Sequence, residues 1–138
     1  MSKKLDIQFG LDNETKVLPI ISKFLNTNLN KLHHFSPIDW VNETKTIYVE
    51  LKSRRIRHNQ YETALLGLNK IKNCKNSNVN YYFVWRYIDG LFYIKYDEEL
   101  FKNFYIEEGF KIGFRKDVGY SELSTIVHVP YKLLKKVL

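Results

Sequence analysis

Apolar residues recur at helical spacing near the start of the chain, and polar residues fill the gaps between them. The apolar positions are Val17, Leu18, Ile21, Phe24 and Leu25. Asp12 or Asn13 can cap a helix with this apolar face, which would place Glu14 in its first turn. Pro19 interrupts the pattern, because an interior proline removes a backbone hydrogen bond and kinks a helix. The pattern therefore predicts a helix that begins near Glu14 or nearer Pro19.

The pattern then changes to strict alternation, which is typical of strands. An extended stretch from Leu32 to Trp40, a polar turn through residues 42–44 and a strand over residues 45–53 predict a β-hairpin. In the second strand, one set of residues alternates with another: Ile47, Val49 and Leu51 with Tyr48, Glu50 and Lys52. A period of 2 sends the two sets to opposite faces. Glu50 and Lys52 are therefore expected to share a face.

Helical spacing returns between Asn59 and Lys75, where the apolar positions predict an amphipathic helix. These positions are Tyr61, Ala64, Leu65, Leu68 and Ile71. An aromatic-rich hairpin is predicted next, because residues 79–88 and 91–96 flank Asp89-Gly90, a pair that a type I′ turn prefers. The remaining pattern predicts a short helix over residues 98–104 and strands near 110–115 and 125–129. A final helix is predicted with Pro130 at its first position.

Composition limits the classes of protein that are compatible with these elements. The chain has 138 residues with 44% hydrophobic residues, which fits one folded domain over residues 1–138. Cys74 is the only cysteine, which excludes an internal disulfide and fits a reducing compartment. With neither a signal-peptide pattern nor an apolar run of membrane-spanning length, no membrane partner and a cytoplasmic or nuclear location are expected. The abundance of Asn, Lys, Ile and Tyr is typical of AT-rich genomes, which many viruses have.

The charge distribution points to an acidic partner. The formal net charge is +7, and residues 52–75 contain seven cations against the single acid Glu62. Nucleic acid is the commonest partner of such a basic protein, although a solvated basic surface without a partner is the alternative.

Three residues of the predicted hairpin can carry phosphodiesterase chemistry. Asp39 lies at the end of the first strand, and Glu50 and Lys52 lie on one face of the second. Mg²⁺ is usually held by one or two carboxylates with waters and phosphate oxygens, so Asp39 and Glu50 are candidate ligands, with the backbone carbonyl of Leu51 as a further ligand. Lys52 would orient the attacking water and stabilise charge on the phosphate.

Glu-x-Lys alone is a weak signal, because it occurs at residues 14–16, 43–45 and 50–52. Residues two apart on a helix do not converge, which removes the first copy, and the second lies in a polar turn. Only the third copy lies on an alternating strand with an acid in the strand before it. An ordinary cross-strand pair on a solvated sheet face is the alternative interpretation of Glu50 and Lys52.

Together these residues resemble the PD-(D/E)xK nuclease superfamily, and within it small Holliday-junction-resolvase-like and viral members. The matching segments are Glu14, residues 37–39, residues 48–54, the segment around Lys70, and the hairpin of residues 81–84 with 89–91. Ile38 separates the proline from the aspartate, which leaves the chemistry intact. The Gln-x-x-x-Tyr of RecB-like members is missing, because Ala64 stands four residues after Gln60.

The resemblance implies an α/β, restriction-endonuclease-like fold with an αβββαβ core, in which helices flank a mixed central sheet. It further implies an Mg²⁺-dependent DNA endonuclease, with Mn²⁺ as a substitute, that leaves 5′-phosphates. Asp39 and Glu50 would bind the metal, Lys52 would assist catalysis and Glu14 would support the metal site. A resolvase-like or otherwise structure-specific activity is expected, and cutting both strands would need two sites, so a homodimer is a hypothesis.

Two other functions remain open at this point. A non-catalytic nucleic-acid-binding protein would keep the fold and the basic surface without cleavage. A protein-interaction subunit would bind no DNA and would lack the steep salt dependence that phosphate contacts produce.

Several other side chains are candidates for DNA contact or are better explained by packing. Arg54, Arg55 and Arg57 follow the catalytic strand and are predicted to bind phosphates, as is Lys70. His33 and His34 lie close to Asp39 in sequence, but at most one can face the site, while His58 and His128 have no zinc-binding spacing. The aromatic residues between Tyr81 and Tyr96 are expected to form core rather than a base-stacking surface.

Overall fold

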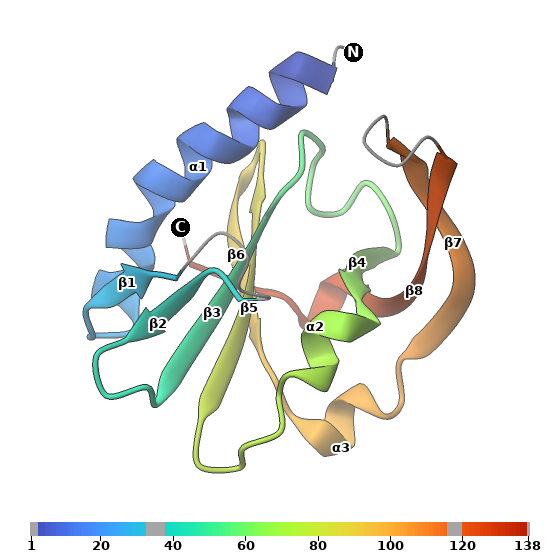
Figure 1. Ribbon diagram of the computed structural model, residues 1–138. Coiled ribbons are helices and arrows are strands. Elements are labelled where there is room, and N and C mark those ends of the chain that lie inside the picture. Colours follow the sequence, from blue (N-terminus) through green and yellow to red (C-terminus); the bar gives the residue numbers. More distant parts are fainter. Residues whose placement is uncertain (1–2, 33–37, 116–119, 138) are drawn as a thin grey trace.

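The computed structural model describes residues 3–32, 38–115 and 120–137, with side chains for residues 14–32, 38–109 and 124–137. Figure 1 shows the arrangement of its elements. In chain order they are α1 (Lys3–Phe24), β1 (Leu29–Lys31), β2 (Trp40–Asn42), β3 (Ile47–Ser53), β4 (Thr63–Gly67), α2 (Leu68–Lys72), β5 (Asn80–Tyr87), β6 (Gly90–Lys95), α3 (Glu98–Phe101), β7 (Tyr105–Arg115), β8 (Tyr120–Pro130), the 3₁₀ turn η1 (Tyr131–Leu133) and β9 (Lys135–Lys136).

The central sheet has six strands in the order β1-β2-β3-β5-β6-β9. β3 and β5 are parallel, and the other neighbours are antiparallel. The parallel pair requires a crossover, which passes through α2. Leaving out β4, the order α1-β1-β2-β3-α2-β5 is the predicted αβββαβ core, and the predicted mixed sheet is confirmed.

Helix α1 covers one face of this sheet (Figure 1). Val17 and Ile21 are buried against Val49 of β3 and Val84 of β5. The helix already begins at Lys3, so the prediction of a start near Glu14 or Pro19, capped by Asp12 or Asn13, is wrong. Glu14 lies well inside the helix. Pro19 is accommodated in its interior, where buried apolar contacts on either side can offset the lost hydrogen bond.

A second sheet with the order β4-β8-β7 packs over the opposite face of the central sheet (Figure 1). Its buried residues share one core with β5 and β6. The members of this core are Ala64, Leu66, Phe83, Trp85, Tyr87, Phe92, Ile94, Phe101, Phe104, Val127, Val129 and Leu134. The aromatic hairpin is therefore core, as predicted.

The predicted helix over residues 59–75 is wrong. Residues 63–67 form strand β4, which pairs with β8, and helix α2 has only five residues. Ala64 and Leu66 are buried while Leu65 is only partly so, which is strand alternation. Tyr61, expected on the apolar helix face, has 57% of its surface exposed. Hydrogen bonding to a distant strand has overridden the local helical pattern.

The hairpin of β5 and β6 is confirmed, but its predicted turn is shifted by one residue. Tyr87 pairs with Gly90, so Ile88 and Asp89 form the loop. Neither residue has a positive φ, so the turn is not type I′. The carboxylate of Asp89 instead accepts hydrogen bonds from the backbone N–H of His58 at 3.0 Å and contacts its Nδ1 at 2.6 Å.

The remaining predictions have mixed outcomes. The hairpin of β2 and β3 is confirmed by the pairing of Trp40 with Val49, although residues 33–37 of the predicted extended stretch lie outside the described residues. The strands near 110–115 and 125–129 are parts of the longer β7 and β8. The predicted final helix is wrong: Pro130 precedes one 3₁₀ turn, and β9 then adds to the edge of β6. Within the described parts of the chain, no helix is long and apolar enough to span a membrane.

Candidate active site

The turn before β3 fixes the strand that carries the candidate catalytic residues. The side-chain oxygen of Asn42 accepts hydrogen bonds from the backbone of Thr46 at 2.9 Å and of Ile47 at 3.0 Å. Val49 then packs toward α1, so alternation places Glu50 and Lys52 on the opposite face, toward α2. The structure thus brings the predicted pair to one face, on a strand held by neighbours on both sides.

Asp39 is attached to this strand through its side chain. Strand β2 pairs with β3 only through Trp40 and Val41. The backbone N–H of Leu51 lies beyond these pairs, so β2 offers it no backbone acceptor. That N–H donates to Oδ2 of Asp39 at 2.7 Å. The carboxylate of Asp39 therefore lies beside the centre of β3. The contact between Asp39 and Leu51 is made by the N–H of Leu51, whereas its carbonyl is the predicted metal ligand.

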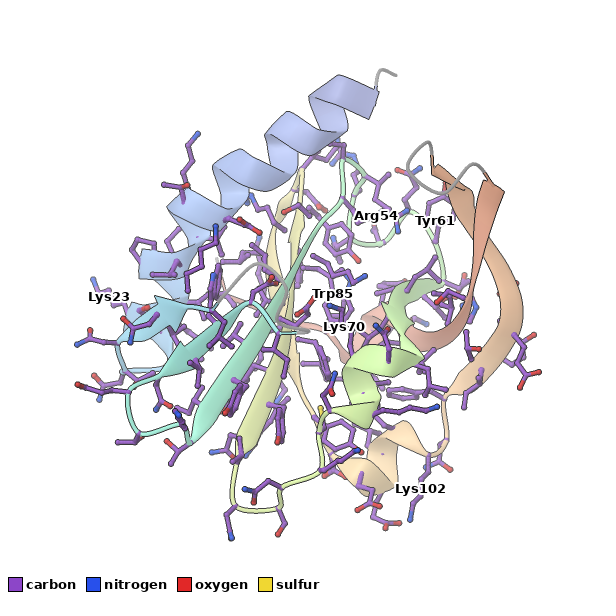
Figure 2. All side chains as sticks on the ribbon, in the orientation of Figure 1. Lys23, Arg54, Tyr61, Lys70, Trp85 and Lys102 are labelled. Carbon is purple, nitrogen blue, oxygen red and sulfur yellow. The ribbon has the colours of Figure 1, made fainter. Side chains whose placement is uncertain are left out.

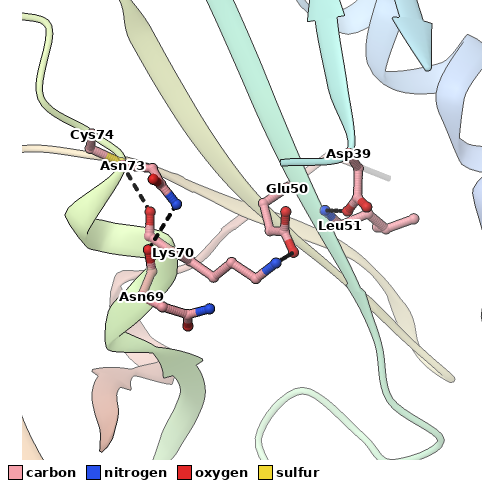
Figure 3. A network of polar contacts seen from close by, with 7 residues as sticks. All are labelled: Asp39, Glu50, Leu51, Asn69, Lys70, Asn73 and Cys74. Atoms are coloured by element: carbon pink, nitrogen blue, oxygen red, sulfur yellow. Dashed lines mark hydrogen bonds and ion pairs between the residues drawn. The ribbon is translucent and has the colours of Figure 1, made fainter. Parts of the chain in front are cut away.

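Glu50 is held from the other side by α2. Nζ of Lys70 lies 3.1 Å from Oε1 of Glu50, and the side chain of Glu50 is only 7% exposed (Figure 3). The second oxygen, Oε2, is buried and has no hydrogen-bond partner among the described residues. An unpartnered carboxylate oxygen is costly to bury, so Oε2 of Glu50 is a candidate ligand for a cation.

Burial raises the pKa of both carboxylates, and the charge of Asp39 also acts on Glu50. Burial is the main cause that raises the pKa of Glu50 to about 7, and the nearby charge of Asp39 adds to it, outweighing the opposing effect of Lys70. Burial also raises the pKa of Asp39, against the lowering effect of the hydrogen bond from Leu51. A buried acid and a half-buried acid, both with raised pKa values, are an arrangement that a divalent cation relieves.

Lys52 has the opposite shift. Burial lowers its pKa, and the positive charges of Lys70 and Arg54 add to this effect, while Glu50 opposes it. A lysine with a lowered pKa releases its proton more readily than an exposed one. Lys52 is therefore suited to proton transfer as well as to stabilising negative charge.

Glu14 reaches the edge of the same site from α1. Its negative charge contributes to the raised pKa of Asp39, which places the two carboxylates near each other. Its Oε2 lies 3.4 Å from Nζ of Lys31 on β1. The structure therefore brings Asp39, Glu50 and Lys52 together at β3, whereas Glu14 acts on Asp39 only through its charge.

A divalent metal fits these residues. The charge of Asp39 acts on Glu50, and Glu50 has a buried oxygen without a partner among the described residues. In the described part of the chain, no three His, Cys, Asp or Glu side chains are grouped as a metal site. Mg²⁺ needs only one or two protein carboxylates, because waters and phosphate oxygens complete its shell.

The predicted DNA-contacting residues fall into two groups. Arg54, Arg55 and Arg57 lie on the segment that leaves β3, and Arg54 and Arg57 are exposed. Lys70 differs, because its ion pair with Glu50 puts it inside the site. Sequence reasoning missed that role, since Lys70 was assigned to a long helix with no indication of which face meets β3.

The two described histidines, His58 and His128, do not join this cluster. His33 and His34 lie outside the described residues. His58 contacts Asp89, while His128 lies between Thr63 at 2.6 Å and Glu107 at 2.8 Å.

An αβββαβ core with an acid after β1 and Glu-x-Lys on β3 defines the restriction-endonuclease-like class of PD-(D/E)xK proteins. The comparison with family models gives a more specific result. The chain belongs to the family described as "Phage putative PDDEXK endonuclease", whose model matches residues 3–137. No curated protein matches the sequence.

Proposed function

We propose that this protein is a metal-dependent endonuclease that hydrolyses DNA phosphodiester bonds, with Mg²⁺ as its metal and Mn²⁺ as a substitute. The observation that carries the proposal is the buried, unpartnered Oε2 of Glu50 beside Asp39, with Lys52 on the same strand face. A fold alone does not establish function. Two acids of raised pKa beside a lysine of lowered pKa support a hydrolytic function more specifically.

Each residue has a distinct role in this proposal. Asp39 and Glu50 hold the metal, the carbonyl of Leu51 is an additional ligand and Glu14 supports the site through Asp39. The bound cation supplies Lewis-acid polarisation of the phosphate and lowers the pKa of a water. Lys52 orients the attacking water and stabilises the charge that develops on the phosphate.

Lys70 is a positioning residue in this scheme. Its ammonium group holds one oxygen of Glu50, so the other oxygen is directed away from Lys70. The ion pair also supplies a counter-charge for Glu50 before metal binds. We infer that Lys70 keeps the ligand in one orientation, in addition to any phosphate contact.

Arg54, Arg55 and Arg57 are proposed to bind the phosphates that flank the cleaved bond. The family description names endonucleases of phages, which supports DNA as the substrate. A resolvase-like or other structure-specific substrate, products with 5′-phosphates and a homodimer belong to the same proposal.

The proposal is tested by cleavage of labelled duplex, flap, junction and single-stranded DNAs in Mg²⁺, Mn²⁺ or EDTA. We expect metal-dependent cutting by the natural chain and a loss of at least about a hundredfold in Lys52→Ala and Asp39→Asn, the scale of one charge-stabilising group. The matched control is Lys102→Ala, which removes an exposed lysine directly after α3 and should cut normally.

Metal binding provides a readout that is independent of cleavage. Isothermal titration with Mg²⁺ or Mn²⁺ should detect binding to the natural chain and to Lys52→Ala, but weaker binding to Asp39→Asn. If no nucleic acid is cut while salt-sensitive DNA binding is equal in all variants, the non-catalytic binding function replaces this proposal.

A further inference from the structure

A pocket of about 380 Å³ opens between the segment that follows β3 and the second sheet. Its lining residues are Arg54, Ile56, Tyr61, Thr63, Ala64, Leu65, Tyr87 and His128. Arg54 and Tyr61 lie near each other at its side (Figure 2). The volume lies within the usual range for small-ligand sites.

The pocket adjoins the catalytic strand. The backbone N–H of Arg54 donates to the carbonyl of Arg86 at 2.9 Å, which extends the ladder of β3 and β5 by one step. Alternation therefore puts Arg54 on the same face as Glu50 and Lys52, with its Cα about 7 Å beyond that of Lys52.

The walls of the pocket suit a flat, largely apolar group. Ala64 and Tyr87 are almost fully buried and form apolar surface, whereas the ring of Tyr61 is 57% exposed. An exposed aromatic ring beside a pocket is a stacking surface, and the adjacent Arg54 supplies a positive charge for a phosphate.

One wall of the pocket is held rigidly. Oγ1 of Thr63 lies 2.6 Å from Nδ1 of His128, and Nε2 of His128 lies 2.8 Å from Glu107. These contacts join β4, β8 and β7. In the register of β4 and β8, Thr63 pairs with Pro130 and Leu65 with His128, so Thr63 and His128 are diagonal neighbours. A wall fixed in this way is preformed, which lowers the cost of binding.

We propose that this pocket receives one unstacked base of the DNA strand, next to the phosphate held at Arg54. The inference rests on the proposed nuclease function and specifies its substrate class: DNA with an unpaired nucleotide adjacent to the cleaved bond. A fully paired duplex keeps its bases stacked, so it has no base to place between Tyr61 and the apolar walls.

The test measures binding by fluorescence anisotropy in EDTA, where no cleavage occurs. Three labelled duplexes of equal length are compared: one with a single bulged adenosine, one with a bulged abasic site and one fully paired. The natural chain should bind the bulged base about tenfold tighter than the abasic bulge, which lies within the range for stacking one base on an aromatic ring.

Tyr61→Leu should remove this preference and leave binding of the paired duplex unchanged. Its control is Phe24→Leu, which replaces another exposed aromatic residue, 45% exposed and outside the pocket lining, and should keep the preference. Equal binding of the two bulges by the natural chain, or a preference that survives in Tyr61→Leu, would overturn the inference. If the paired duplex is then still cut in Mg²⁺, only this inference fails, whereas absence of all DNA binding overturns the nuclease proposal as well.

Discussion

Glu50 is a charged residue in the middle of a sheet, and its surroundings do not favour its charge. Burial raises its pKa to about 7, and Lys70 satisfies only one of its oxygens. An apolar residue at this position would be expected to pack more favourably in the metal-free chain. The site therefore trades folding stability for chemistry, as functional sites commonly do.

Because Glu50 has a raised pKa, the free energy of unfolding should depend on pH. The pKa of Glu50 is raised from 4.5 to about 7, so between these values the folded chain keeps a proton that the unfolded chain releases. The free energy of unfolding of the metal-free chain therefore falls as pH rises through this window. At about 1.4 kcal/mol per pH unit the loss approaches roughly 3 kcal/mol.

Glu50→Gln imitates the protonated acid and should remove this loss. In EDTA at pH 7.5 the variant should be more stable than the natural chain, and at pH 4.5 the two should be nearly equal, as measured by urea unfolding. Lys70→Met serves as a control, because it removes the opposing charge and should enlarge the pH dependence. A Glu50→Gln variant destabilised equally at both pH values would contradict the prediction.

At the scale of elements, the sequence predicted what local patterns determine. The alternation in β3 is contained in seven residues, and the β5–β6 hairpin has two apolar runs around a short loop. Asp39 could be predicted because it precedes Glu-x-Lys by one hairpin connection. These features depend on residues that are close together in the chain.

The predictions that were wrong concern residues whose partners are distant in the sequence. Residues 61–71 fit helical spacing, but Thr63 to Gly67 pair with residues 126–130, which no local window contains. Once this segment is a strand, only five residues remain helical, and one of them, Lys70, meets Glu50. The role of Lys70 could therefore not be predicted without the second sheet.

Two neighbouring leucines distinguish the strand from the predicted helix. Leu66 is fully buried in β4, whereas the helical pattern placed Leu65 rather than Leu66 in the core. Leu66→Ala should lower the free energy of unfolding by about 2–5 kcal/mol, the usual cost for a buried leucine, and Leu65→Ala by about 1 kcal/mol or less. Urea unfolding of both variants checks this, and the reverse order would support the helix.

At the scale of the whole molecule, the second sheet and the central sheet share a core. Val127 and Val129 of β8 are buried with Phe83 and Trp85 of β5, while Trp40 lies in the separate core under α1. Because β5 contributes to both cores, through Val84 on one face and Trp85 on the other, the two sheets should unfold together.

Val129→Ala tests this coupling. The residue is fully buried in β8, so the change should cost about 2 kcal/mol. Tryptophan fluorescence and far-ultraviolet circular dichroism should report the same shifted midpoint, in one transition. Separate midpoints for the two signals would mean that the second sheet unfolds independently.

Strand β4 is inserted between β3 and α2, and its attachment to β8 has a consequence for how such an enzyme can diversify. The acids and lysines of the candidate site lie on α1, β3, α2 and just before β2, whereas residues of β4 and β8 line the neighbouring pocket. Substitutions on these two strands can thus alter which nucleic acids are accepted and leave the hydrolytic residues untouched. If the proposed function and the proposed base pocket hold, preference for a target and capacity for cutting are encoded in separable parts of the chain, so selection can act on one while preserving the other.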